Sequence, residues 1–459
     1  MGVTRSRRRF LKTTAKAGLG LFILANSRSV HSAQANERLN IALIGVGGRG
    51  TWFVDTIPNL GENVVALCDV DGERAAEAFR RFPDTRRFQD YREMLGEMGD
   101  RIDAVIVATP DHSHAPASMM AMKMGKHVLC EKPLTHNVRE ARLMRQTAVE
   151  RKVATQMGNQ GTATGGFRRA LELIQAGTLG EIRDVYVWRD SGGPGHRNRP
   201  TDTSPVPPHL RWDLWLGPAA DRPYHPAWMN WHSWREFGTG ELGNWASHTA
   251  NLAFRSLKVD SLWYADPAAA PRITVEAQVS EIDRDSFPRW EMIRFHIPER
   301  GELAPVTLHY YNGAGAPGAR DEIERLLGRR LDWGDYGEKK WQDHAGTLIV
   351  GSEGRLHSTG HNTEFTLLPE ERFAGLQGPP QSLPQSPGHE REWLMACRGG
   401  ERAWSNFDYA GPLAEFLHLG NVATQFDGAI EFDPMACKIV NNPDADGALQ
   451  RAYREGWSL

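Results

Sequence analysis

Cysteine, charge of one sign and long hydrophobic runs are all scarce in this sequence, and each absence excludes a class of protein. Only four of the 459 residues are cysteine, too few and too scattered for a disulfide scaffold. Lys and Arg together number 54 against 57 for Asp and Glu, so the formal net charge is −3. Beyond the N-terminus no sustained basic patch could neutralise a row of phosphates, and nucleic-acid binding is therefore not expected.

Recognisable metal-ligand spacing is also lacking. Histidines gather at residues 109–114 and 225–232, which leaves a metalloenzyme as an alternative, but the spacings fit no standard ligand set. We predict no metal site. The composition, with 40% hydrophobic and 24% charged residues, is that of a soluble globular protein, and the length favours two domains.

The first 35 residues are typical of an export signal. Residues 6–12 read S-R-R-R-F-L-K, a modestly apolar run covers 15–25, and Ala33-Gln34-Ala35 offers a small-residue cleavage site. Paired arginines before Phe-Leu-Lys resemble the twin-arginine signal. A disordered basic tail or an uncleaved anchor is the alternative. We expect a periplasmic or otherwise exported protein with no stable membrane insertion once the signal is removed.

A glycine-rich turn follows the first apolar strand. Residues 39–44 are apolar, and residues 45–50 read G-V-G-G-R-G, which is G-x-G-x-x-G in its required strand-to-helix setting. Gly45 permits the tight turn, Gly47 lets the backbone approach a pyrophosphate, and Gly50 allows the helix to pack on the strand. The pattern predicts a Rossmann dinucleotide-binding fold.

The residue that follows the next strand indicates which dinucleotide is bound. Strand 63–68 ends in Asp69, about twenty residues beyond the glycines, as the fingerprint expects. A carboxylate there accepts hydrogen bonds from ribose hydroxyls and repels a 2′-phosphate. We therefore predict NAD rather than NADP as the cofactor.

Two polar clusters follow later strands of the same predicted sheet. Strand 102–108 leads into T-P-D-H-S-H at 109–114, and strand 127–130 leads into E-K-P at 131–133. In open α/β sheets ligands lie beyond the carboxyl ends of the strands. Taken singly, His112 and His114 would be helix-capping or solvated residues, but their shared sheet edge favours cofactor contact.

These motifs, and above all C-E-K-P-L at 130–134, resemble the glucose–fructose oxidoreductase / inositol dehydrogenase (Gfo/Idh/MocA) family. The resemblance covers nearly the whole chain after the signal. It implies that Lys132 lies by the nicotinamide and the reacting hydroxyl, whose oxygen must lose a proton when hydride leaves the carbinol carbon. A surface salt bridge is the alternative role for Lys132. The residues predicted to bind NAD are Gly45, Gly47, Gly48, Arg49, Gly50, Asp69, Thr109, Pro110, His112, His114, Glu131, Lys132 and Asn159.

The pattern changes after residue 155. Segments 273–279, 293–297 and 306–311 alternate with period two, which predicts an antiparallel sheet with one covered face. We therefore predict an α/β protein: a signal peptide over 1–35, a doubly wound parallel Rossmann domain over 36–155, and an α+β substrate-binding domain over 156–459 with a mainly antiparallel open sheet. The resemblance implies that this open sheet forms a homo-oligomer surface. The insertion at 313–342 has no assigned role.

An aromatic stretch lies inside this second domain. Seven of the fifteen tryptophans fall between residues 188 and 245. Aromatic faces stack on sugars, although tryptophans also staple irregular loops by burying large areas. We expect most to be structural, with one or two touching a carbohydrate substrate. They are Trp188, Trp212, Trp215, Trp228, Trp231, Trp234 and Trp245.

The stretch ends in a candidate catalytic motif. The family pattern is D-x-x-x-H-x-x-D after a glycine-rich turn, and His248 matches its histidine. Asn244 lies one helical turn earlier on the same face, so Lys132, Asn244 and His248 are the predicted catalytic residues. Both family carboxylates are amides here, Asn244 and Asn251, so His248 lacks the acidic neighbour that would raise its basicity.

An export signal constrains how the cofactor is used, because no pool of NAD exists outside the cytoplasm. We hypothesise an NAD-dependent sugar oxidoreductase whose tightly held NAD is reduced and reoxidised within each cycle. Glycoside cleavage through a transient keto sugar, resembling glycoside hydrolase family 109, is the alternative. A non-catalytic sugar-binding protein is a weaker one. The sequence leaves open the sugar and the bond acted on.

Overall fold

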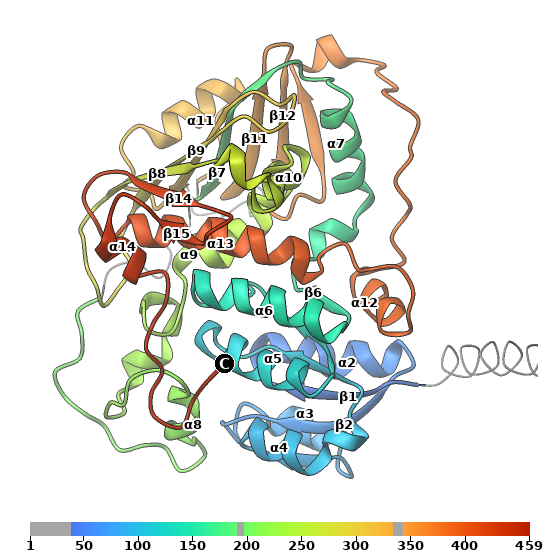
Figure 1. Cartoon of the computed structure of the whole chain (residues 1–459), viewed down its shortest axis with the longest axis vertical. Helices are drawn as coiled ribbons and strands as arrows, with labels where there is room; N and C mark the ends of the chain where they lie inside the picture. The colour runs from blue at the N-terminus through green and yellow to red at the C-terminus, as the bar shows by residue number, and fades with distance from the viewer. Residues whose placement is uncertain (1–37, 191–196, 334–342) are drawn as a thin grey trace, which may run out of the picture.

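A parallel sheet of six strands, which lie between residues 40 and 157, forms the N-terminal part of the molecule (Figure 1). The computed structural model describes residues 38–190, 197–333 and 343–459, so the predicted signal at 1–35 lies outside the described residues. The strand order is β3-β2-β1-β4-β5-β6, which confirms the predicted Rossmann sheet. The strands are β1 (Asn40–Ile44), β2 (Asn63–Cys68), β3 (Arg86–Phe88), β4 (Ala104–Val107), β5 (His127–Cys130) and β6 (Thr155–Met157).

The connecting helices cover both faces of this sheet, so its central strands are buried apolar runs. Side-chain caps begin two of the helices: Asp90 accepts a hydrogen bond from Arg92 N at 2.8 Å, and Asn137 accepts one from Glu140 N at 3.0 Å. The main helices are α2 (Thr51–Asn59), α3 (Ala76–Arg81), α4 (Tyr91–Met98), α5 (His114–Lys123) and α6 (Val138–Arg151).

A mixed nine-stranded sheet forms the second half, in the order β13-β12-β11-β7-β10-β9-β8-β14-β15. Only the β7–β10 pairing is parallel among the described strand pairs of this sheet, which confirms the predicted mainly antiparallel layout. The strands are β7 (Ile182–Arg189), β8 (Ile273–Val279), β9 (Glu291–Ile297), β10 (Val306–Asn312), β11 (Ala345–Gly351), β12 (Arg355–Thr359), β13 (Phe365–Leu368), β14 (Ile430–Asp433) and β15 (Lys438–Ile439).

Part of the insertion at 313–342 covers one face of this second sheet. Helix α11 (Ala319–Leu327) packs on β7, β10 and β11, where Trp188, Tyr311 and Leu348 form a buried cluster with Ile323. The face that the family resemblance implies as an oligomer surface is therefore covered over these three strands. Residues 334–342 of the insertion lie outside the described part.

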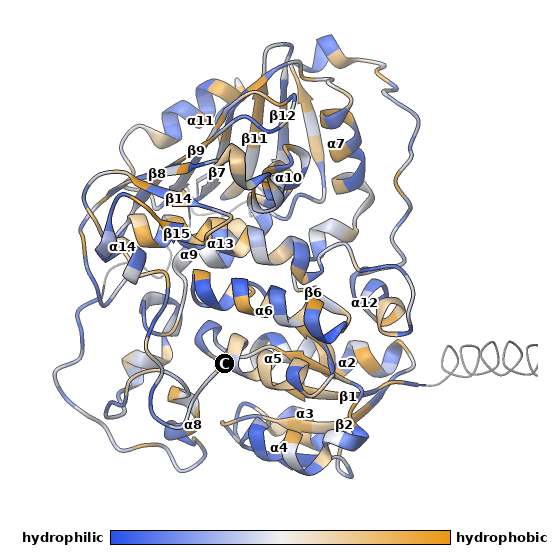
Figure 2. Ribbon diagram, viewed as in Figure 1, coloured by the Kyte–Doolittle hydropathy of each residue, from blue (hydrophilic) through white to orange (hydrophobic). Residues whose placement is uncertain are grey.

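The inner faces of the two sheets share one hydrophobic core. Helix α13 (Phe407–Ala423) packs against α6 between the sheets, and α12 (His389–Cys397) places Trp393 in the core of the first sheet. Figure 2 shows hydrophobic residues concentrated in the strands, while helices such as α11 turn hydrophilic residues outward.

The state of two cysteines and the length of the helices relate to two expectations from the sequence, the lack of a disulfide scaffold and the lack of stable membrane insertion. Cys68 and Cys130 end β2 and β5, where both are buried free thiols. Across 38–190, 197–333 and 343–459, none of the helices combines the length and apolar character needed to cross a bilayer.

Candidate active site

A cavity of about 310 Å³ lies beyond the carboxyl ends of β1, β2, β4 and β5. The strand order reverses between β1 and β4, the position where open α/β sheets bind their ligands. Eleven predicted site residues line the cavity: Gly45, Gly47, Gly48, Arg49, Asp69, Thr109, Pro110, His114, Glu131, Lys132 and Asn244. Four others, Gly50, His112, Asn159 and His248, lie outside its wall.

Close backbone packing explains two of the glycines. Gly45 adopts φ +79°, and a Cβ on it would lie 2.6 Å from Ala108 O. A Cβ on Gly50 would lie 1.8 Å from Gly45 O, so any side chain there would push the helix off the strand. Gly50 therefore acts through packing rather than through contact with a ligand.

Asp69 shapes the glycine turn as well as facing the cavity. Its Oδ2 accepts hydrogen bonds from Val46 N at 2.9 Å and Gly47 N at 3.1 Å, and its Oδ1 accepts one from Asp71 N at 3.0 Å. Burial raises the pKa of Asp69, although these backbone donors oppose the rise. A carboxylate has about four acceptor positions, so ribose hydroxyls can still donate to it.

Glu131 and Arg49 form an ion pair on the wall of the cavity. Arg49 Nε donates to Glu131 Oε1 at 2.8 Å, and the Glu131 side chain is buried. A Cβ on Gly158 would lie 2.4 Å from Glu131 Oε2, so the chain after β6 leaves just enough room for this carboxylate. The pair fixes Arg49 beside the glycine turn.

Lys132 points across the cavity to helix α9 (Gly240–Thr249). Its Nζ donates to Asn244 O at 3.1 Å and to Asn244 Oδ1. Burial lowers the pKa of Lys132, while the carboxylates of Glu131, Asp111 and Glu241 act against that shift. The Lys132 amine thus hydrogen-bonds the neutral Asn244, and the carboxylates of Glu131, Asp111 and Glu241 lie farther away.

Glu241 brings a carboxylate one turn before Asn244 on α9. Its Oε2 lies 3.7 Å from Arg189 Nε, and the Arg189 guanidinium lies 4.0 Å from the centre of the Trp245 ring. Burial raises the pKa of Glu241, opposed by Arg189, Lys132 and a hydrogen bond with Asn244. This residue was not predicted, because the family pattern places its carboxylates at 244 and 251.

Asp111 is a second unpredicted carboxyl group and lines the cavity. It follows β4 in the 3-10 turn Asp111–Ser113, and its Oδ2 accepts a hydrogen bond from Thr239 Oγ1 at 2.6 Å. Burial raises the pKa of Asp111 to about 7. Only its membership of T-P-D-H-S-H could have suggested a role from the sequence.

His248 lies one turn beyond Asn244 but behind the cavity wall. Its ring meets the His361 ring edge to face, with centroids 4.5 Å apart. Burial lowers the pKa of His248 well below its usual range, and the nearby Lys132 adds to the effect. The imidazole is therefore neutral at physiological pH.

The remaining predicted residues hold the surrounding chain. His112 places its ring nitrogens 2.9 Å from Trp215 O and 3.3 Å from Phe237 O, so it supports the aromatic stretch rather than facing the cavity. His114 contacts the carbonyl oxygens of Thr109 and Pro133 at 2.8 Å each. Asn159 accepts a hydrogen bond from Ser405 in the buried chain that follows α12.

The aromatic stretch closes the far end of the cavity. Trp215, from α8 (Trp212–Leu216), and Trp231 line the wall, and behind them Trp212, Trp228 and Trp234 are buried in the hydrophobic cluster to which Trp215 also belongs. His232 stacks on Trp231 with ring centroids 3.5 Å apart, and burial lowers its pKa to about 4. Members of the wall that were not predicted include Arg74, Asp111, Leu214, Met229 and His232.

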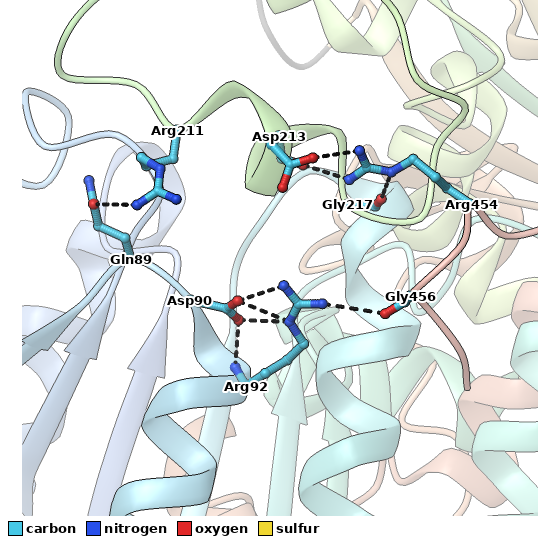
Figure 3. A network of polar contacts seen from close by, with 8 residues as sticks. All are labelled: Gln89, Asp90, Arg92, Arg211, Asp213, Gly217, Arg454 and Gly456. Carbon is cyan, nitrogen blue, oxygen red and sulfur yellow. Dashed lines mark hydrogen bonds and ion pairs between the residues drawn. The ribbon is translucent and has the colours of Figure 1, made fainter.

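The last residues of the chain tie α8 to the Rossmann domain (Figure 3). Arg454 Nη1 donates to Asp213 Oδ1 at 2.6 Å, and its Nε donates to Gly217 O at 3.1 Å. Arg92 on α4 donates to Gly456 O at 3.4 Å and lies 4.2 Å from the centre of the Trp457 ring. Sequence reasoning offered no signal for this connection between distant segments.

Residues 39–159 match a protein-family model, GFO_IDH_MocA, described as an oxidoreductase family with an NAD-binding Rossmann fold. The first sheet with its helices is therefore similar to the NAD-binding domain of the Gfo/Idh/MocA family. This match supports the predicted enzyme class, an NAD-dependent oxidoreductase, and its description as an NAD-binding Rossmann fold agrees with the predicted cofactor.

Individual relatives match over part of their length. Levoglucosan dehydrogenase from Pseudarthrobacter phenanthrenivorans is 30% identical over 171 residues, which cover 34% of this chain and 43% of that protein. A glycosyl hydrolase family 109 protein from Saccharopolyspora erythraea is 28% identical over 204 residues, 39% of this chain and 44% of that protein. The matched part thus spans less than half of these curated relatives.

Similarity to solved structures extends over most of the chain. The WlbA dehydrogenase from Bordetella pertussis, solved with NADH and UDP-GlcNAcA, superposes with a TM-score of 0.55 over 86% of this chain and 98% of that one. At 16% sequence identity this likeness shows the fold alone. In the part of the chain that the structure describes, no group of three or more His, Cys, Asp or Glu side chains is arranged to hold a metal ion.

Proposed function

We propose that this chain is an NAD-dependent oxidoreductase of a sugar or sugar derivative, with tightly held NAD that is recycled in each turnover. One observation carries the proposal. Gly45 of the glycine turn, Lys132 and Trp231 of the aromatic stretch all line the same cavity. Cofactor residues and a candidate proton acceptor therefore share one space beside aromatic surface suited to a sugar.

The residues at the strand ends fit NAD. Gly45 and Gly47 line the cavity in the turn that would face a pyrophosphate, Asp69 faces the cavity where ribose hydroxyls would donate, and Arg49 and Arg74 offer guanidinium groups to phosphate oxygens. When bound, NAD accepts a hydride from a carbinol carbon and can return it.

Lys132 is the group suited to the hydroxyl proton. Its amine lines the cavity and has a lowered pKa, so a larger share of it is neutral than in an exposed lysine. A neutral amine accepts the proton that the carbinol oxygen loses, and Asn244 orients the amine through its carbonyl and amide oxygens. Trp215 and Trp231 offer apolar faces to the sugar ring.

Export through the twin-arginine route is part of the proposal and would make a resident cofactor necessary. The protein should be purified without its first 35 residues, denatured, and assayed for released nucleotide. Near-stoichiometric NAD would support the closed cycle. Protein that is empty and active only with added NAD would contradict tight retention while leaving the oxidoreductase assignment intact.

A second candidate is NAD-dependent glycoside cleavage through a transient keto sugar. The similarity to a family 109 glycosyl hydrolase favours it, as does a carboxyl group, Asp111, in the cavity with Lys132. A panel of glycosides distinguishes the candidates. Release of the aglycone without net NADH would support cleavage, whereas net NADH or sugar-to-sugar transfer would support oxidoreduction.

A further inference from the structure

The cavity holds a buried carboxyl group, Asp111, that a simple hydride transfer does not require. Removing hydride from a carbinol carbon needs one proton acceptor, and Lys132 supplies it. Asp111 lines the same cavity from the loop after β4, and its side chain is almost fully buried, with 1% relative exposure. The proposed oxidoreductase reaction leaves Asp111 without a chemical role.

The partners of Asp111 differ from those of the neighbouring carboxylate. Glu131 is ion-paired with Arg49 at 2.8 Å, which stabilises its charge. Asp111 instead accepts a hydrogen bond from the Thr239 hydroxyl at 2.6 Å, and Lys132 acts on it through space. A buried carboxylate held mainly by a neutral hydroxyl is costly to keep charged. Burial accordingly raises the pKa of Asp111 to about 7.

Such a group both accepts and donates a proton near neutral pH, the range in which general acid–base catalysis is most effective. Thr239 directly precedes α9, the helix that carries Asn244, so the Asp111–Thr239 contact also fixes this carboxyl group relative to Lys132. The groups that act on Asp111 from the surrounding elements are Lys132 after β5 and the hydroxyl and amide of Thr239.

We propose that Asp111 is a second acid–base residue, which removes and returns the proton on the carbon next to the carbonyl of an oxidised sugar. This inference rests on the proposed function. The C–H bond breaks, its electron pair enters the enolate that extends to the carbonyl oxygen, and the proton passes to the Asp111 carboxylate. The reverse step returns the proton to carbon, so no further oxidant or reductant is consumed. Epimerisation and elimination both begin with this step.

One test measures proton exchange separately from hydride transfer. NAD-loaded protein is incubated in D₂O with D-glucose, myo-inositol and methyl β-D-glucopyranoside, and deuterium on carbon is followed by NMR while NADH is followed by absorbance. For the isosteric variant Asp111→Asn we expect exchange to fall by about 100-fold or more, and NADH formation to fall much less. Glu77→Gln, which changes an exposed carboxylate on α3, should change neither rate.

A second measurement needs no substrate. The carboxyl groups of ¹³C-Asp-labelled NAD-loaded protein are titrated by NMR, and the Asp111 signal is assigned from its loss in Asp111→Asn. A midpoint near 7 supports the proposal, and Thr239→Val should move it upward because the carboxylate loses a hydrogen-bond donor.

The outcomes separate the two proposals. Exchange that survives in Asp111→Asn, or a carboxyl group that titrates below about 5, would overturn the role of Asp111 while leaving the oxidoreductase assignment untouched. If no probe gave either NADH or sugar-to-sugar transfer, the proposed function would be contradicted, and the substrate-free titration would still judge Asp111 by its midpoint.

Discussion

The two ends of the cavity are built in different ways. At the cofactor end the wall is built around the glycine turn, and its residues Gly45, Gly47 and Asp69 directly follow the adjacent strands β1 and β2 of one sheet. At the substrate end the wall is made of side chains from α8, the turns at 226–233 and α9, which converge from separate parts of the chain.

This difference separates what the fold requires from what determines specificity. A change at the cofactor end disturbs the packing of strand, turn and helix, which is needed whichever substrate binds. Side chains at the substrate end can be exchanged on an unchanged backbone, so we expect substrate choice to depend on them. The following predictions test whether the two ends respond separately.

The largest effect is expected from Gly50→Val at the cofactor end. A side chain there would collide with Gly45 O, because even a Cβ would lie 1.8 Å from that oxygen. We expect a loss of about 3 kcal/mol or more in the free energy of unfolding, together with loss of bound NAD. Urea denaturation and nucleotide content measure the two effects.

Gly96→Ala is the matched control, because Gly96 is exposed within α4 and an added Cβ meets nothing within 4 Å. This control should stabilise the protein by about 0.5–1 kcal/mol. If Gly50→Val kept its NAD and its stability, the glycine turn would be less constrained than its packing implies.

The next largest effect is expected from Lys132→Met at the junction of the two ends. Removing the amine should lower kcat/KM by about 10²–10⁴-fold while leaving NAD bound, because the glycine turn remains intact. Steady-state kinetics and nucleotide content check this result. Lys438→Met, which changes an exposed side chain on β15, should have no effect on either. Unchanged turnover in Lys132→Met would remove the role proposed for this residue.

Asn244→Asp should shift the pH dependence of kcat/KM rather than lower its maximum value. The variant places an anion against Nζ of Lys132. The more distant carboxylates of Glu131, Asp111 and Glu241 already act on the pKa of Lys132 in the same direction, and Arg49 acts against them. Opposite charge raises the pKa of Lys132, so the limb of kcat/KM that rises with pH should shift upward by about 1–3 units.

A pH profile of kcat/KM measures this shift, and Asn251→Asp is the comparison because Asn251 hydrogen-bonds Tyr409 away from the cavity. An unchanged profile in Asn244→Asp would mean that the free amine of Lys132 is not the proton acceptor.

The cofactor end could be predicted from the sequence because its residues follow their strands directly. The glycine turn and Asp69 carry the signal in a few consecutive residues, and the period-two pattern indicated β8, β9 and β10. The short strands β3 and β15 were not predicted, because β3 has two exposed arginines among its three residues and β15 has only two residues.

The substrate end could not be predicted in the same way, because its residues meet only in the folded chain. Glu241 and Asp111 approach Lys132 from α9 and from the loop after β4, and His232 does so through the aromatic stretch. His112 shares a motif with the cavity residue His114, yet the two carbonyls it contacts turn it towards the chain around Trp215 and Phe237. Sequence spacing contains no information about which carbonyl a buried imidazole reaches.

The smallest effect is expected where the end of the chain holds the substrate wall. Arg454→Ala removes the contacts to Asp213 and Gly217 that hold α8, the helix that presents Trp215 (Figure 3). Because the Asp213 side chain is 69% exposed, solvent screens the ion pair and the loss should be only about 1 kcal/mol. If this contact keeps the wall closed, NAD should dissociate about fivefold faster.

Dilution of NAD-loaded protein into a nucleotide-free buffer, followed by fluorescence, measures that dissociation rate. Arg80→Ala removes an exposed ion pair with Glu77 on α3 and should leave the rate unchanged. A faster rate confined to Arg454→Ala would mean that the substrate wall also retains the cofactor, so that the two ends differ in construction but act together in holding NAD. Equal rates would instead assign retention to the backbone of the cofactor end alone, and α8 would serve the substrate only.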